Sequence, residues 1–98
     1  MNFLEFKESL SAPAPPSGLL PSLQSLWWDA QNDWEKAHMI VQEDDSQESA
    51  WIHAYLHRKE GDIGNAQYWY HRAQQQQSIL SIEDEWEHIA RHICSSHK

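Results

Sequence analysis

A helix–turn–helix pattern in the second half of the sequence constrains the fold more than any other feature. The run Asp45–Glu48 has the spacing of a capping box, so we expect a helix over about residues 46–60. Gly61 is a typical left-handed helix stop, and Asp62 is well placed to cap a second helix over about residues 63–76. So short a turn predicts an antiparallel helical hairpin.

One more helix is predicted on each side of this hairpin. Between Pro21 and about Gln42, apolar side chains recur at helical spacing, which predicts one continuous helix. A second stripe after Ser81 predicts a C-terminal helix. The first stripe consists of Leu23, Leu26, Trp27, Ala30, Trp34, Ala37, His38 and Val41. The second consists of Ile82, Trp86, Ile89, Ala90 and Ile93. Because no segment has strand-like alternation, we expect an all-α fold, a small antiparallel four-helix bundle with the hairpin at its centre.

The first 18 residues are expected to form an arm outside this bundle. Phe3, Phe6 and Leu10 share helical spacing, but a helix this short is not stable alone and has to dock on the body or on a partner. Residues 11–18 hold three of the four prolines and predict an extended linker. We therefore divide the chain into an arm and linker, 1–18, and a single helical domain, 19–98.

The composition narrows the class of partner. The chain has 15 acidic and 7 basic residues, a formal net charge of −8. Nucleic acids and anionic membranes are bound by clustered Lys and Arg, so we expect the protein to bind neither. No run approaches the ~20 apolar residues of a membrane span. The single cysteine, Cys94, allows no internal disulfide and suits a reducing compartment, so we expect a cytoplasmic protein.

Two adjacent tryptophans suggest a contact between molecules. Trp27 and Trp28 cannot both face one core from the same helix. We expect one of them at the surface or at an interface, which makes the protein a possible homo-oligomer.

The hairpin resembles a single tetratricopeptide or Sel1-like repeat. The matching residues are Ala54, Gly61, Ala66, Tyr70 and Ala73. The resemblance implies close helix packing. It implies no function, because the concave binding surface of these repeats is made by tandem copies and no second copy is recognisable in the sequence. It also implies that His53 and His57 replace an inward-facing Leu and Tyr.

A longer string is similar to the core of an uncharacterised family of small helical proteins. It comprises His53, Ala54, His57, Arg58, Glu60, Asp62, Asn65, Tyr68, Trp69 and Arg72. The family pattern is His-Arg-Arg-Glu-x-Asp, then Asn, then Tyr-Trp-Phe-Arg, from which Lys59 and Tyr70 depart. This resemblance implies a shared site or scaffold and no particular activity.

Histidines on the hairpin are the candidate functional residues. His53, His57 and Glu60 are spaced to share one helical face, and His38 lies on the inner stripe of the preceding helix. Two imidazoles and a carboxylate, with His38 as a fourth ligand, can hold a divalent metal. The pattern lacks the glutamate base of the zinc-hydrolase motif. A hydrogen-bonded structural network and an organic-ligand pocket are the alternatives.

The same face predicts a wider binding pocket. Its candidate residues are His38, His53, His57, Glu60, Tyr68 and Arg72. Near the turn, Gly61, Asp62 and Asn65 are interpreted as structural turn and cap residues, whereas Arg58 and Arg72 are within reach of the turn carboxylates or of an anionic ligand.

Three functions follow as hypotheses. The first is a cytoplasmic interaction module that binds a partner or a small molecule at this pocket, with no cofactor required. The second is a metal-dependent enzyme using the histidine face. The third is a purely structural homodimer, in contact through Trp28 and the arm from Phe3 to Leu10.

Overall fold

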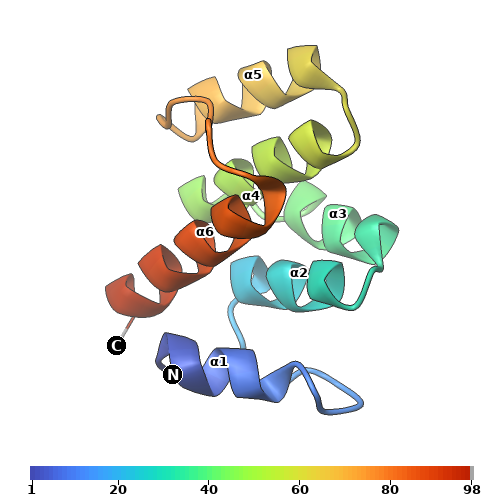
Figure 1. The fold of residues 1–98 in the computed structure, drawn as a ribbon, viewed down its shortest axis with the longest axis vertical. Helices are drawn as coiled ribbons and strands as arrows, with labels where there is room; N and C mark the ends of the chain where they lie inside the picture. The colour runs from blue at the N-terminus through green and yellow to red at the C-terminus, as the bar shows by residue number, and fades with distance from the viewer. Residues whose placement is uncertain (98) are drawn as a thin grey trace.

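The computed structural model describes residues 1–97, and within this range it has six helices and no strand (Figure 1). They are α1 (Phe3–Ser9), α2 (Pro21–Ala30), α3 (Trp34–Gln42), α4 (Gln47–Lys59), α5 (Ile63–Arg72) and α6 (Ile82–Ser96). The all-α prediction is confirmed, and no helix found in the described range is long and apolar enough to cross a bilayer.

The predicted helix over residues 21–42 is wrong, because it breaks into α2 and α3. Asn32 adopts a left-handed conformation with φ of 66°, which asparagine tolerates better than most residues. Asp33 then caps α3 by accepting a hydrogen bond from the Lys36 amide. The apolar stripe continues across this break, so its spacing gave no sign of it. The predicted four-helix bundle is therefore replaced by six helices in the described chain.

The other helix ends follow local capping chemistry. Ser46 caps α4 by accepting from the Ser49 amide, so the predicted cap at Asp45 is one residue too early. Helix α5 ends at Arg72, before the predicted Gln76, because Gln74 is left-handed with φ of 59°. Ser81 caps α6, as the sequence predicts.

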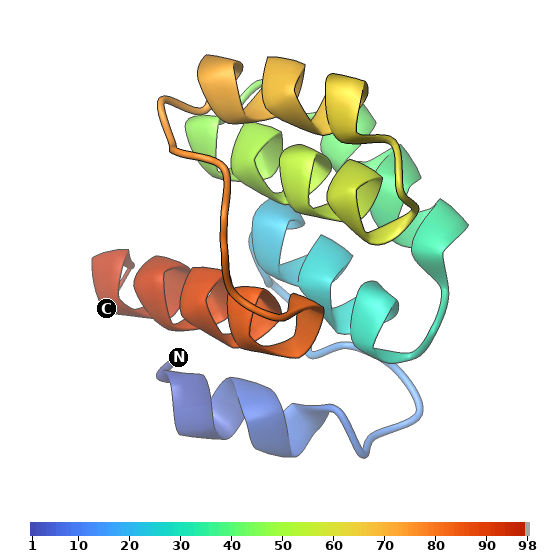
Figure 2. The same cartoon turned by 45° about the horizontal axis from the view of Figure 1, so that its top comes forward.

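Helix α4 is the centre of the core. All seven residues from Trp51 to His57 are buried, because α4 packs against α2, α3, α5 and α6. Figure 2 shows α6 lying between α1 and the α4–α5 hairpin, and α6 also contacts α2. The arm docks on the body through α1, since Phe6 is fully buried and its ring stacks on Trp86 at 5.9 Å.

The α2–α3 and α4–α5 hairpins share one pattern. Each has a small buried residue on its first helix, a left-handed residue in its turn, an aspartate cap and a buried alanine on its second helix. One constant sequence offset relates Ser25 to Ala54, Asn32 to Gly61, Asp33 to Asp62 and Ala37 to Ala66. The first unit escapes recognition in the sequence because Ser and Asn replace Ala and Gly. Residues 1–97 thus contain two such hairpins, where the sequence suggested one.

A three-histidine cluster between the hairpins

His38, His53 and His57 meet where α3 of the first hairpin packs against α4 of the second. One ring nitrogen from each lies within 4.8 Å of the other two. The Nε2 atoms of His38 and His53 are 3.0 Å apart, and the rings of His53 and His57 stack with centroids 4.9 Å apart. The helical spacing of His53 and His57 explains their pairing, whereas His38 joins them only through the α3–α4 contact.

The cluster is largely withdrawn from water. His53 is 4% exposed and His57 is 7% exposed, while His38 is partly exposed. Burial, aided by the neighbouring His38 and His57, lowers the pKa of His53 to about 3. Burial and the nearby His57 also lower the pKa of His38. These two imidazoles are therefore neutral at neutral pH and keep a lone pair available.

Two tryptophans hold the rings in place. Trp34 stacks on His38 with ring centroids 4.8 Å apart, and Trp69 stacks on His53 at 3.9 Å. Trp34 is itself fixed, because its Nε1 donates a hydrogen bond to the Leu56 carbonyl at 2.9 Å. Trp34 was not a predicted site residue, although its position one turn before His38 is a usable sequence signal.

Glu60 orients His57. A carboxylate oxygen of Glu60 lies 2.6 Å from His57 Nδ1. An Nδ1–H that donates to a carboxylate leaves the lone pair on Nε2, the arrangement that commonly supports a metal-binding imidazole. Glu60 therefore acts on the cluster through His57.

One nitrogen of the cluster has no polar partner. His53 Nδ1 is buried and makes no hydrogen bond within the described residues. Buried polar groups are paired in most proteins. His53 Nδ1 stays without a partner whether Nε2 takes part in a hydrogen-bonded network or binds an ion.

Tyr68 and Arg72 lie apart from the ring nitrogens. Tyr68 is 53% exposed and accepts a hydrogen bond from Arg72 at 3.3 Å. The Arg72 guanidinium lies over the Trp69 ring, 5.2 Å from its centroid. Among the described residues, neither side chain hydrogen-bonds to a histidine of the cluster.

The turn residues have structural roles. Gly61 is left-handed with φ of 90°. Asp62 caps α5 and accepts from both the backbone and the side-chain amide of Asn65. Asp62 also lies near His57 and Glu60, but its oxygens already serve as the cap.

Two buried carboxylates were missed in the sequence. Asp29 accepts from Tyr55 at 2.6 Å and from Lys59 at 2.9 Å. Glu85 accepts from Arg58 at 2.8 Å and from the Tyr70 hydroxyl. Arg58 thus pairs with α6, where the sequence suggested the turn. These contacts join residues far apart in the chain, for which local spacing gives no signal.

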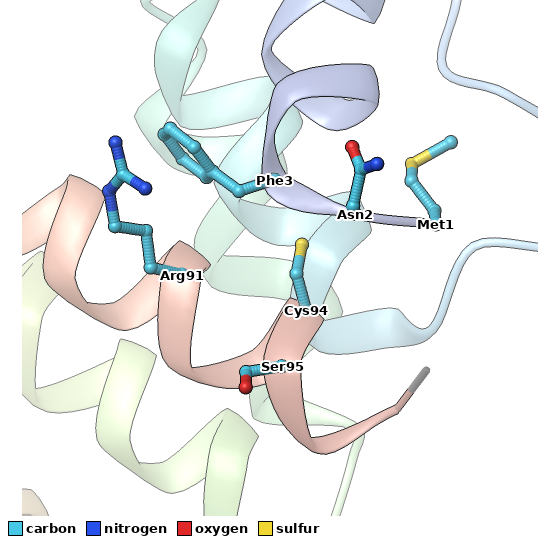
Figure 3. A pocket seen from close by; sticks show the side chains of 6 residues that line it. All are labelled: Met1, Asn2, Phe3, Arg91, Cys94 and Ser95. Atoms are coloured by element: carbon cyan, nitrogen blue, oxygen red, sulfur yellow. The ribbon is translucent and has the colours of Figure 1, made fainter.

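The cavities large enough for a small molecule lie away from the histidine cluster. A cavity of about 560 Å³ lies between the start of α1 and the end of α6, where Figure 3 shows Phe3, Arg91 and Cys94 among its lining residues. Two others, of about 290 and 410 Å³, border α6. None of these three is lined by a histidine of the cluster.

Comparison with protein-family models, with curated proteins and with solved structures found no match.

Proposed function

We propose that this protein binds a divalent transition-metal ion through His38, His53 and His57. The observation that carries the proposal is the convergence of three ring nitrogens from two hairpins within 4.8 Å of one another. An ion, unlike an organic molecule, fits among nitrogens so closely spaced.

The spacing is close to that of ligands on one metal. Two bonds of ~2.0–2.1 Å at angles of ~90–110° place their nitrogens ~2.9–3.4 Å apart. The His38 and His53 Nε2 atoms meet this condition at 3.0 Å, where they form a hydrogen bond with each other that a bound ion would replace. The third nitrogen lies within 4.8 Å of the other two and would move inward on binding an ion.

The donors indicate the class of ion. Imidazole suits zinc, copper and nickel, whereas calcium and magnesium prefer oxygen ligands. Three protein ligands leave a position for water or an anion. The partly exposed side of His38 offers a route from solvent.

The metal-site hypothesis changes in one respect. The sequence suggested Glu60 as a ligand, whereas its contact with His57 Nδ1 supports a role in orienting that ring. Binding supports no particular reaction, so the proposed function is metal binding and the enzyme hypothesis is not developed further.

The wider setting is part of the same proposal. We infer a cytoplasmic location, where Cys94 stays reduced. The two hairpins of one pattern support an origin as repeat units of the tetratricopeptide or Sel1-like kind, joined at the metal centre. The quoted family pattern includes the positions of His57 and Glu60 but not those of His38 and His53, so the similarity supports a shared scaffold and does not extend to the whole cluster.

Metal titration tests the function. The purified protein, stripped with a chelator, is titrated with zinc, nickel and cobalt while heat release and tryptophan fluorescence are followed. We expect one tight site, quenching by nickel and cobalt because Trp34 and Trp69 stack on ligand rings, and loss of that site in His53→Leu.

Two control variants distinguish metal binding at the cluster from metal binding by histidines on the surface. His88 and His92, one turn apart and both exposed on α6, form a second chelating pair. His88→Gln with His92→Gln should leave the tight site unchanged, as should substitution of the exposed His71 by Leu. Equal metal stoichiometry in wild type and His53→Leu would overturn the proposal.

A further inference from the structure

The cavity of about 290 Å³ lies where four segments of the chain converge. Residues just after α1, at the end of α2, on the second half of α4 and on the first turns of α6 all contribute to its wall. Leu10, Ile82 and Trp86 make part of this wall apolar. Small-molecule sites in proteins begin at about 300 Å³, so this cavity suits a compact ligand.

A buried carboxylate, that of Asp29, forms another part of the wall. Asp29 is 2% exposed, and it accepts one hydrogen bond from the Tyr55 hydroxyl at 2.6 Å and one from Lys59 Nζ at 2.9 Å. An ionised carboxylate has about four acceptor positions. About two of them are thus unused among the described residues. A buried charge with unused acceptor positions favours a ligand that brings N–H donors.

The charges around the cavity favour a cationic ligand. Glu83 supplies a second carboxylate, against one ammonium group, that of Lys59, among the described lining residues. Burial and the nearby carboxylates of Asp29, Glu85 and Glu83 raise the pKa of the Tyr55 hydroxyl, as expected where the potential is negative. A positive charge in this partly dry space is attracted more strongly than it would be in bulk water.

We propose that this cavity binds a small organic ammonium ion, a primary amine attached to a compact apolar body. The ammonium group donates to the unused acceptor positions of Asp29, while the apolar body lies against Leu10, Ile82 and Trp86. Lys59 provides the precedent, because its own ammonium group is bound by Asp29.

The Lys59 side chain does not block this site. It is 33% exposed, so water screens its repulsion of a second cation and its flexible stem can turn the charged end outward. The three histidines of the cluster do not line the cavity. The ammonium site therefore stands independently of metal binding and is tested on metal-free protein.

Three probes with the same ring test the charge preference. Benzylammonium, benzyl alcohol and benzoate are each titrated into the protein while the indole N–H resonance of Trp86 is followed by NMR. That N–H donates to the Leu26 carbonyl at 3.0 Å, so its resonance reports on the cavity wall. We expect saturable binding of benzylammonium at about millimolar concentration. The neutral and anionic probes should bind at least about ten-fold more weakly.

Two variants of charged wall residues should change the affinity in opposite directions. Lys59→Met removes the competing ammonium group and should tighten benzylammonium binding about ten-fold. Glu83→Gln should weaken it about two- to five-fold. Asp84→Asn is the matched control, because Asp84 is the next residue on α6, is exposed and does not line the cavity. This control should leave the affinity unchanged.

Two further variants should abolish binding. Asp29→Asn removes the central charge while keeping an acceptor for Tyr55. If that variant does not fold, Ala30→Leu serves instead, because Ala30 is an exposed residue in the cavity wall and a larger side chain there fills the space with Asp29 intact. Equal affinity for the three probes, or unchanged benzylammonium binding in Ala30→Leu, would overturn the proposal. Absence of saturation by ~20 mM benzylammonium would do the same and leave the cavity to water alone.

Discussion

Each histidine of the cluster is held by a different neighbour. Trp34 fixes His38, Trp69 fixes His53 and Glu60 fixes His57. Such outer contacts govern how well a site is organised for a metal.

Removing the Glu60 carboxylate should weaken metal binding without abolishing it. Outer partners of this kind contribute about 10–100-fold in affinity, so we expect a loss of that order in Glu60→Ala. Glu60→Gln keeps an acceptor for His57 Nδ1 and should lose less. Competition titration against a chelating dye measures both values, and an unchanged affinity in Glu60→Ala would contradict the assigned role.

The metal-free protein should tolerate loss of His53. Its Nδ1 is buried without a partner, and an apolar side chain of similar size removes that unsatisfied group. We expect His53→Leu to be as stable as wild type or about 1 kcal/mol more stable in urea unfolding of metal-free protein. A loss of more than about 2 kcal/mol would show that the imidazole is needed for folding itself.

At the scale of single elements, turns and caps decide where helices end. Two glycines three residues apart in the sequence have different backbone conformations. Gly61 is left-handed with φ of 90°, whereas Gly64 lies inside α5 without a positive φ. A Cβ at either position would meet open space.

Alanine at these two positions should therefore change stability in opposite directions. We expect Gly61→Ala to lower the free energy of unfolding by about 1–2 kcal/mol, because a left-handed alanine is strained. Gly64→Ala should raise it by about 0.5–1 kcal/mol. Chemical denaturation measures both, and equal effects would contradict the assigned turn.

The start of α4 should be sensitive to acid. The hydroxyls of Ser46 and Ser49 donate to Asp44 and lower the pKa of its carboxyl. A carboxyl whose pKa is lowered in the folded state stabilises the protein at pH values above its unfolded pKa of about 3.9. This stabilisation is lost as the pH falls through the folded pKa. The stability difference between wild type and Asp44→Asn should thus shrink below about pH 4. A stability difference that is constant from pH 7 to pH 3 would contradict this role of the Asp44 carboxylate.

At the scale of the whole molecule, the histidine cluster and the ion pairs join segments that are far apart in the chain. His38 belongs to the first hairpin and His53 to the second, so a bound ion would join them. Arg58 and Glu85 in turn join α4 to α6. An ion that binds only the folded state should raise the free energy of unfolding by RT ln(1 + c/Kd), where c is the free-ion concentration, so the melting temperature should rise with the logarithm of c above Kd.

The parts of this fold that sequence could predict are those set by neighbours along the chain. Gly61 and Ser81 mark their helix ends locally, and the spacing of His53, His57 and Glu60 places them on one face. Asn32 was missed because the apolar stripe passes over it unchanged. The pairing of Glu85 with Arg58 depends on how helices pack, which spacing does not encode.

Anomalous X-ray diffraction from zinc-soaked crystals, recorded at the zinc edge, tests the central claim most directly. The account predicts one strong peak ~2.1 Å from a ring nitrogen of each of His38, His53 and His57. Anomalous density confined to His88 and His92 on the surface, with the cluster metal-free, would contradict it.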